Sequence, residues 1–381
     1  MRPCSGSEVA VLQIVSYPLD DVALVAAPAT GAVAVVDAAG RAILEGLRDG
    51  RDERELAVTL AATHGLAADS ALGQVAELRR AWADLARPRP AVRSSVTAAM
   101  PACPAALDAL CRLGPVSVRL RVWPPRLAAL VDAVTAHCRA NGSDGAGSSA
   151  VPILGVWRSS GRYALFQDGT HLLTTDSLMI ARSELLRRLV LASHPERQWM
   201  AILHAAGVAG PNGAALLCGS SGAGKSTLTG FLLASGLDLV TDDYAPLESG
   251  SHRLWPVPFG LSAKEGSWPL LARHFPDLAT TPVVRSRLRR QRYLRAPRVS
   301  AGPQTVRCLV FPLYRAGADV ELIALQPGEA LELCARSGGW YESSRERLGE
   351  FTRWLAGVPA YALSYGDAAG AVATVRRLIS C

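Results

Sequence analysis

Lysine is almost absent from this sequence of 381 residues. Of its 40 basic residues only Lys225 and Lys264 are lysines, which leaves 38 arginines (40 − 2 = 38). The arginine bias runs through the whole chain, so the formal net charge of +7 does not by itself indicate a nucleic-acid partner. In such a chain, lysine is expected where a compact and flexible point charge is required.

Paired metal-binding cysteines and export signals are also lacking. The eight cysteines include no C-x-x-C pair, which argues against a zinc site and, at this length, against a disulfide framework. Residues 1–17 have no basic-then-apolar signal pattern, and the apolar run over 22–36 is interrupted by Pro28 and Gly31. We therefore expect a cytoplasmic protein with no membrane partner, and the length favours two domains.

The first 90 residues have the pattern of a small α+β domain. The stretch "DVALVAAPATGAVAVVD" alternates and turns like a β-hairpin, and short helices are expected over 43–47 and 53–62. A third helix is predicted over 72–85, where apolar residues recur at steps of three and four. The proline-rich stretch "ARPRPAVRSS" is interpreted as a linker. An exposed hairpin edge can be extended by a bound peptide.

This pattern, over residues 12–90, resembles the PqqD-like domains that bind leader peptides of ribosomally made, modified peptides. The likeness rests on "SYPLDDVALV", "GAVAVVDAAGRAILEGLRDGRDERELAVTLA" and the final helix. A winged-helix-like domain with a structural or DNA-binding role is the alternative. The third helix carries Arg79 and Arg80 beside Glu77 and Asp84, which is a poor footprint for phosphates, so no nucleic-acid partner is expected.

The strongest motif of the chain is "GSSGAGKS". A short apolar run, "GAALLCG", leads into it, and "KSTLTGFLLAS" follows as a predicted helix ended by Gly236, the order of elements in a phosphate loop. Backbone N–H groups and the helix N-terminus would bind the phosphates, Lys225 would reach the β- and γ-phosphates, and the Ser226 hydroxyl would join the coordination of Mg²⁺. The residues expected to bind ATP are Gly219, Ser220, Ser221, Gly222, Ala223, Gly224, Lys225, Ser226 and Thr227.

Acidic side chains follow this helix closely. The strand predicted over 237–241 ends at Asp242 and Asp243, and we expect it to lie next to the phosphate-loop strand with its end at the same crevice. One carboxylate can then contact the metal while the other accepts a proton from an attacking hydroxyl. Upstream, a hairpin could return His204 to the loop as a polar partner, although a histidine on an apolar stretch can also be a core residue.

The stretches "LHAAGV", "GSSGAGKS", "LVTDD" and "PFGLSAKEGS" together resemble the HPr kinase/phosphorylase family over roughly residues 155–378. The resemblance implies an α/β P-loop kinase domain, placed here at 104–381, that phosphorylates serine or another hydroxyl with ATP and Mg²⁺. It maps the general base onto Asp242, the metal-side carboxylate onto Asp243 together with Ser226, and the family's upstream histidine onto His204. Lys225 completes the expected catalytic set.

One departure from the family concerns the substrate. The glycine-rich signature of the bifunctional enzymes has no clear equivalent, and "RSRLRRQRYLRAPR" stands in that region, which removes support for phosphorylase activity and for the HPr protein as substrate. The arginine run could bind an acidic peptide or phosphate oxygens, or be a solvated loop. Lys264, Arg290 and Arg292 are the candidate substrate contacts.

Together the two resemblances predict a kinase for a ribosomally synthesised precursor peptide, of the kind found in lasso-peptide pathways. The domain at 12–90 would hold the leader and raise the local concentration of the acceptor serine at the kinase site. Two alternatives stay open: a kinase of a folded protein or of a small molecule such as serine, and a nucleotide-binding regulator without transfer. The sequence also leaves a homo-oligomer open.

Overall fold

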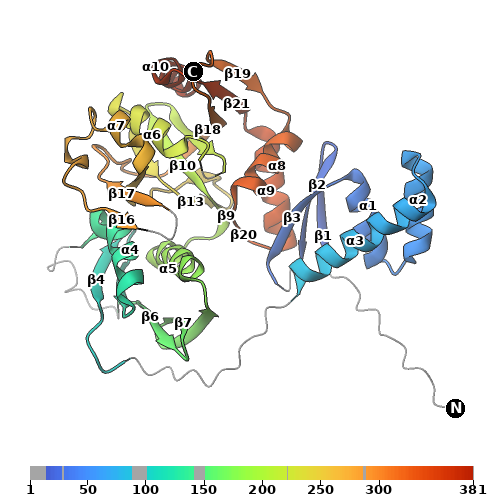
Figure 1. Ribbon diagram of the computed structural model, residues 1–381, viewed down its shortest axis with the longest axis horizontal. Coiled ribbons are helices and arrows are strands. Elements are labelled where there is room, and N and C mark those ends of the chain that lie inside the picture. Colours follow the sequence, from blue (N-terminus) through green and yellow to red (C-terminus); the bar gives the residue numbers. More distant parts are fainter. Residues whose placement is uncertain are drawn as a thin grey trace. The chain divides into compact units, whose positions relative to one another are not determined.

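The computed structural model describes residues 14–27, 30–87, 101–140, 151–220, 222–285 and 289–380. Their contacts divide the chain into two compact units (Figure 1). The first takes Met1–Ala91, Leu325–Ala335 and Tyr341–Gly357, and the second takes Val92–Ala324, Arg336–Trp340 and Val358–Cys381. Ser221, residues 88–95 of the expected linker, and the stretch 141–149, which the sequence suggests to be a flexible loop ("RANGSDGAGSS" over 139–149), lie outside the described residues.

The N-terminal part of the first unit has the expected hairpin and three helices, together with a further strand over Val15–Leu19 that is not among the elements expected from the sequence. Its strands form a sheet of order β1-β2-β3, in which β2 is buried along its whole length. Helix α1 begins after Asp37, whose side chain accepts from the Gly40 N–H at 2.7 Å. The elements are β1 (Val15–Leu19), β2 (Val22–Ala27), β3 (Ala32–Asp37), α1 (Ala38–Arg48), α2 (Glu53–His64) and α3 (Ala68–Ala86).

Two helices from far along the chain complete this unit, which differs from the contiguous boundaries expected at 12–90 and 104–381. They are α8 (Pro327–Ser337), up to Ala335, and α9 (Arg345–Gly357). Asp20 accepts from the Gly328 N–H at 2.8 Å, and Tyr17 donates to the Arg345 carbonyl oxygen. Gly349 permits the approach of α9, because a Cβ there would lie 2.7 Å from the Tyr17 ring. Sequence periodicity cannot reveal such contacts, since 308 to 328 residues separate the partners.

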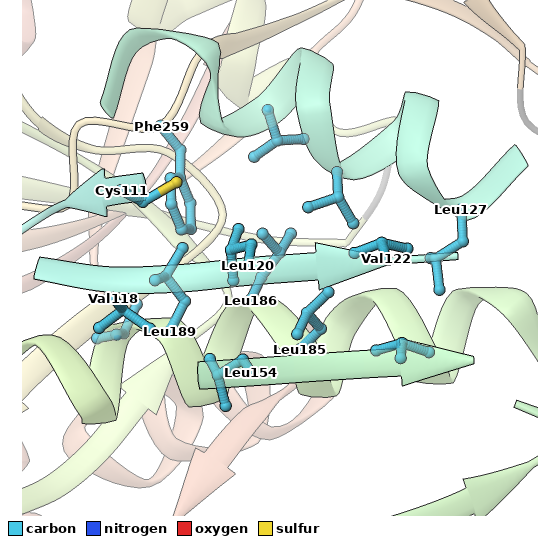
Figure 2. Packing of buried hydrophobic residues seen from close by; sticks show 14 of the residues in the cluster. Cys111, Val118, Leu120, Val122, Leu127, Leu154, Leu185, Leu186, Leu189 and Phe259 are labelled. Carbon is cyan, nitrogen blue, oxygen red and sulfur yellow. The ribbon is translucent and has the colours of Figure 1, made fainter. Parts of the chain in front are cut away.

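The second unit is mixed α/β, and its first part is a five-stranded sheet of order β4-β5-β6-β7-β8. An apolar cluster lies between helices and strands of this part (Figure 2). It fully buries Leu120 on β5 and Leu185, Leu186 and Leu189 on α5. Burial of each such leucine stabilises the fold by roughly 2 kcal/mol. The elements are β4 (Leu107–Arg112), β5 (Ser117–Val122), α4 (Pro125–Thr135), β6 (Ile153–Ser159), β7 (Arg162–Gln167), β8 (Thr170–Thr175) and α5 (Leu178–Ser193).

A larger sheet carries the phosphate-loop motif. Its order is β12-β10-β11-β18-β14-β13-β9-β20, with β21 paired to β18 and β19 paired to β21. Helices α6 and α10 contact each other and pack on its strands. The elements are β9 (Trp199–Leu203), β10 (Ala205–Gly210), β11 (Gly213–Cys218), α6 (Lys225–Ala234), β12 (Asp238–Thr241), β13 (Ala245–Glu248), β14 (Arg253–Leu254), β18 (Gln304–Tyr314), β19 (Glu321–Ala324), β20 (Gly339–Tyr341), β21 (Ala360–Tyr365) and α10 (Ala368–Ser380).

A small antiparallel sheet of order β15-β17-β16 completes the second unit. It consists of β15 (Leu261–Lys264), β17 (Arg290–Leu294) and β16 (Val284–Arg285), and helix α7 (Trp268–Leu271) follows β15. Lys264 pairs in register with Gln291 of β17. In neither unit does the described part of the chain contain a helix with the length and apolar character needed to cross a bilayer.

Candidate functional site

The loop between β11 and α6 has the backbone of an anion cradle. Gly219, Gly222 and Gly224 have φ values of 146°, 106° and 97°, a region that L-residues with a side chain rarely adopt. Helix α6 begins at Lys225 without any side-chain hydrogen bond at its N-cap, Gly224. Its first N–H groups are therefore available to an anion at the positive end of the helix dipole. The strand, loop and helix lie where the sequence predicts them.

His204 reaches this loop through the sheet. It lies between β9 and β10, and in the β10–β11 hairpin Ala205 pairs with Cys218, so the residue before β10 is level with the start of the loop. The expected hairpin return is thus present. The His204 N–H donates to the Gly338 carbonyl oxygen at 3.1 Å, which fixes the backbone at this position.

The aspartates arrive from β12, but the expected neighbour relation is wrong. Strand β12 pairs with β10 and not with β11, so one antiparallel strand separates it from the phosphate-loop strand. Both β12 and β11 are antiparallel to β10, and their C-terminal ends therefore lie at the same edge of the sheet. Sequence proximity to the loop helix correctly indicates a shared edge, but the hairpin strand inserted between the two strands could not be anticipated from spacing alone.

A pocket of about 380 Å³ collects most of the expected site. Its walls come from the phosphate loop, from the ends of β10 and β12, from the small sheet and from α5. The expected residues among its lining are Ser220, Gly222, Gly224, Lys225, Ser226, Thr227, His204, Asp243 and Lys264. Gly219 and Ala223 belong to the loop without lining the pocket.

The two adjacent aspartates occupy different environments. Asp242 is 2% exposed and does not line the pocket; its Oδ2 accepts from the Ser262 N–H at 2.8 Å, and its Oδ1 is buried without a partner among the described residues. Burial, and next the neighbouring Asp243, raise the pKa of Asp242 to about 8. Asp243 has a left-handed backbone with φ of 68°, and its side chain faces the pocket. The carboxylate expected to be the base, Asp242, is therefore the one that is withdrawn from the pocket.

His204 and Asp243 form a polar pair at the pocket wall. The His204 Nδ1 lies 3.8 Å from Oδ1 of Asp243. Burial lowers the pKa of His204, although Asp243 opposes this effect. The imidazole is therefore neutral at neutral pH and can orient the Asp243 carboxylate without adding a positive charge.

The two lysines of the chain meet at this pocket. Lys225 is buried, and its Nζ donates to the Gly219 carbonyl oxygen. Burial lowers the pKa of both Lys225 and Lys264, and Asp243 and Asp242 favour the charged form of each. Both lysine side chains of the sequence therefore lie at the same pocket.

The two expected substrate arginines face elsewhere. Arg290 forms an ion pair with Glu265, and its guanidinium carbon lies 5.5 Å from the Trp268 ring centre. Arg292 donates to the Leu278 carbonyl oxygen and lies 4.5 Å from the same ring. Neither lines the pocket, because both are engaged in holding the small sheet against α7 and the segment after it.

Sequence reasoning missed part of the lining. The residues concerned are Met179, Arg182, Ser262, Arg289, Gln291 and Tyr293. No sequence signal could have found Arg182, because it is one of 38 arginines. It lies on α5, which follows the strands of the five-stranded sheet and precedes the phosphate loop by a long stretch of chain. It reaches the site only through tertiary packing.

The donors present fit a nucleotide with Mg²⁺. No group of three or more His, Cys, Asp or Glu suited to a metal occurs among the described residues. Mg²⁺ in nucleotide sites usually takes one or two protein oxygens, with phosphate and water oxygens as the other ligands. The Ser226 hydroxyl and the Asp243 carboxylate, both at the pocket, supply that kind of donor.

Comparison of the sequence with models of known protein families and with curated proteins gives no match.

Proposed function

We propose that this chain is an ATP- and Mg²⁺-dependent kinase that phosphorylates a serine or other hydroxyl of a ribosomally synthesised precursor peptide. One observation carries the proposal: Lys225 and Ser226 of the phosphate loop line the same pocket as Asp243 and His204. A phosphate cradle with a carboxylate at the same wall is the arrangement that phosphoryl transfer to a hydroxyl requires.

In this mechanism Asp243 accepts the proton of the acceptor hydroxyl as the oxygen attacks the γ-phosphorus and the bond to the β-phosphate oxygen breaks. We assign this role to Asp243 rather than Asp242, because only Asp243 lines the pocket. Lys225 and the loop N–H groups bind the phosphate oxygens and stabilise the developing charge. Ser226 and one carboxylate oxygen of Asp243 would hold Mg²⁺, which supplies charge neutralisation at the phosphates, while the other Asp243 oxygen is the proton acceptor.

Leader binding by the first unit is the second part of the proposal. Its three-stranded sheet ends at β3, which pairs with no strand other than β2 within the described residues and is half-buried over most of its length. A peptide strand can add to such an edge through main-chain hydrogen bonds. Helices α8 and α9 contribute to the same unit, so deletion of the N-terminal residues would also uncover these helices.

The test therefore removes the leader from the peptide and leaves the protein intact. Full-length protein is incubated with ATP, Mg²⁺ and a precursor peptide encoded beside its gene, and the added phosphate is localised by mass spectrometry. We expect phosphorylation of the core region and a strong rise in KM for the leaderless core. Equal turnover of both peptides would favour the alternative in which the first unit is merely structural.

A nucleotide-binding regulator without transfer is the other alternative. It predicts ADP and ATP binding with no phosphate on any acceptor. Asp243→Asn would then leave the function of the protein in the cell unchanged, whereas the kinase proposal requires that function to be lost.

A further inference from the structure

Arg182 lies within helix α5 and is a buried cation at the pocket. Its side chain is 7% exposed, and it lines the pocket together with Tyr293 and Gln291 of β17. Its Nη2 donates to the Tyr293 hydroxyl oxygen at 2.9 Å, and its Nε is buried without a hydrogen-bond partner. Within the described part of the chain no carboxylate forms an ion pair with it.

Burial opposes the charge of this guanidinium, whereas Tyr293 and Asp243 favour it. Arginine is almost never fully buried unless it is paired, because a buried charge without an opposite charge loses its hydration without compensation. The neighbouring residues on α5 belong to the apolar cluster and include Ala181, Leu185 and Leu186. In these apolar surroundings the unpartnered Nε indicates a donor that is retained for a ligand.

The hydrogen bonds around Tyr293 also indicate a donor that is retained for a ligand. Its hydroxyl oxygen accepts from Arg182 at 2.9 Å and from the Gln291 side-chain amide at 2.6 Å. With both acceptor positions used, the hydroxyl proton is left to be donated. Arg182 and Tyr293 thus present donors from one wall, and Lys264 and Arg289 add positive charge to the same pocket.

The phosphates already have a binding site elsewhere in the pocket. Lys225 lies in the phosphate loop at the start of α6, whereas Arg182 comes from α5 beside β17. Asp243 favours the charged form of both cations, so it lies within electrostatic reach of each. A ligand at Arg182 therefore shares the pocket with Asp243.

We propose that Arg182 and Tyr293 form a subsite for a carboxylate that the acceptor carries next to its reacting hydroxyl. A planar guanidinium binds a carboxylate through two parallel hydrogen bonds, and a charge-assisted bond from the Tyr293 hydroxyl fits beside them. The subsite positions the acceptor so that its hydroxyl meets Asp243. This inference rests on the proposed kinase function, since it specifies the acceptor of that reaction.

The carboxylate can come from two sources, which the experiment separates. It is the terminal carboxylate of a residue that itself bears the hydroxyl, or an acidic side chain beside that residue. Three labelled peptides of equal length serve as probes: one ends in serine with a free carboxylate, one ends in serine amide, and one ends in serine amide preceded by aspartate.

Binding is measured on the full-length protein after saturation with ADP and Mg²⁺. Failure to bind ADP would overturn the proposed function, and it is scored before any peptide is added. With ADP bound, we expect one of the two carboxylate peptides to bind about tenfold more tightly than the plain amide, the effect of one charge-assisted contact. The preferred peptide identifies the source of the carboxylate.

In Arg182→Met this preference should fall to about onefold while ADP affinity stays unchanged. The thermal midpoint reports whether the variant folds, and Tyr293 keeps its bond from Gln291. Arg182→Lys, which keeps the charge without the planar fork, should retain part of the preference and serves if the methionine variant does not fold. Arg188→Met is the matched control, since Arg188 lies on the same helix and pairs with Glu184 outside the pocket.

Three outcomes would overturn the subsite. The first is equal binding, or no binding, of all three peptides by the ADP-bound wild type. The second is a preference that survives in Arg182→Met. The third is weaker ADP binding by Arg182→Met, which would assign the guanidinium to the phosphates of the nucleotide.

Discussion

Replacement of Asp242 by asparagine should make the ligand-free protein more stable at neutral pH and less stable in acid. In the folded chain the pKa of Asp242 is raised from 3.8 to about 8, mainly by burial. The unfolded chain therefore ionises this carboxyl near pH 4, whereas the folded chain keeps it protonated until about pH 8. Stability is fully present below pH 4 and is lost as pH rises through this window, because the unfolded state is favoured by its ionisation.

The magnitude follows from the width of that window. Each pKa unit corresponds to about 1.4 kcal/mol, and pH 7 lies about three units above the ordinary pKa, so the ionisable carboxyl costs about 4 kcal/mol there. Asparagine cannot ionise, and its carbonyl oxygen can still accept from the Ser262 N–H. Its amide nitrogen would occupy the place of the unpartnered Oδ1 and costs about 1–3 kcal/mol as a buried donor without an acceptor. The net expectation is a gain of about 1–3 kcal/mol at pH 7.

Urea denaturation of wild type and Asp242→Asn, at intervals from pH 4 to pH 8, measures this difference directly. The difference should change sign within the range, with wild type the more stable protein at pH 4 and the variant the more stable at pH 7. Asp238→Asn is a useful comparison, because Asp238 begins β12 and pairs with the exposed Arg298. A difference between wild type and Asp242→Asn that does not vary with pH would refute the reasoning.

Three further predictions concern the loop, the base and the small sheet. Asp243→Asn should abolish phosphate transfer while ADP still binds, as seen by mass spectrometry and calorimetry. Gly222→Ala and Gly224→Ala should each lose about 1–2 kcal/mol of stability because of their positive φ values. Gly224→Ala should lose more and should also weaken ADP binding, because its Cβ would lie 2.9 Å from the Tyr365 hydroxyl. A Cβ at Gly222 would have nothing within 4 Å. Arg292→Met should lower the thermal midpoint without changing KM for the acceptor; a large rise in KM would return Arg292 to the substrate site.

Local chemistry in the sequence predicts the parts of the site that lie close together along the chain. The glycine run requires positive φ values, and a helix must begin at Lys225, so the geometry of the loop follows from one stretch of eight residues. The shared edge of β11 and β12 also follows, because the connecting helix is short. The hairpin and the three helices over residues 22–86 follow from periodicity and from the turn and cap residues between them.

What could not be predicted depends on contacts between distant segments. Nothing in the sequence distinguishes Asp242 from Asp243, and only the fold shows that one is buried and the other faces the pocket. The same holds for Arg290 and Arg292, which have a basic pattern typical of a ligand site but are held by Glu265, Trp268 and Leu278. An arginine-rich composition hides Arg182, which is buried at the pocket.

Several features of this pocket destabilise the folded chain when no ligand is bound. Asp242 holds a raised pKa and an unpartnered oxygen, Asp243 has a left-handed backbone, and the Nε of Arg182 is buried without a hydrogen-bond partner. Each feature destabilises the ligand-free state, and such features persist where a ligand compensates for them. If nucleotide and acceptor are those ligands, stabilisation by ADP and a carboxylate peptide together should fall short of the sum of their separate effects, because each anion lowers the positive potential of the shared pocket that attracts the other. Additive shifts in the thermal midpoint would instead mean that the phosphate loop and the wall at Arg182 are occupied independently.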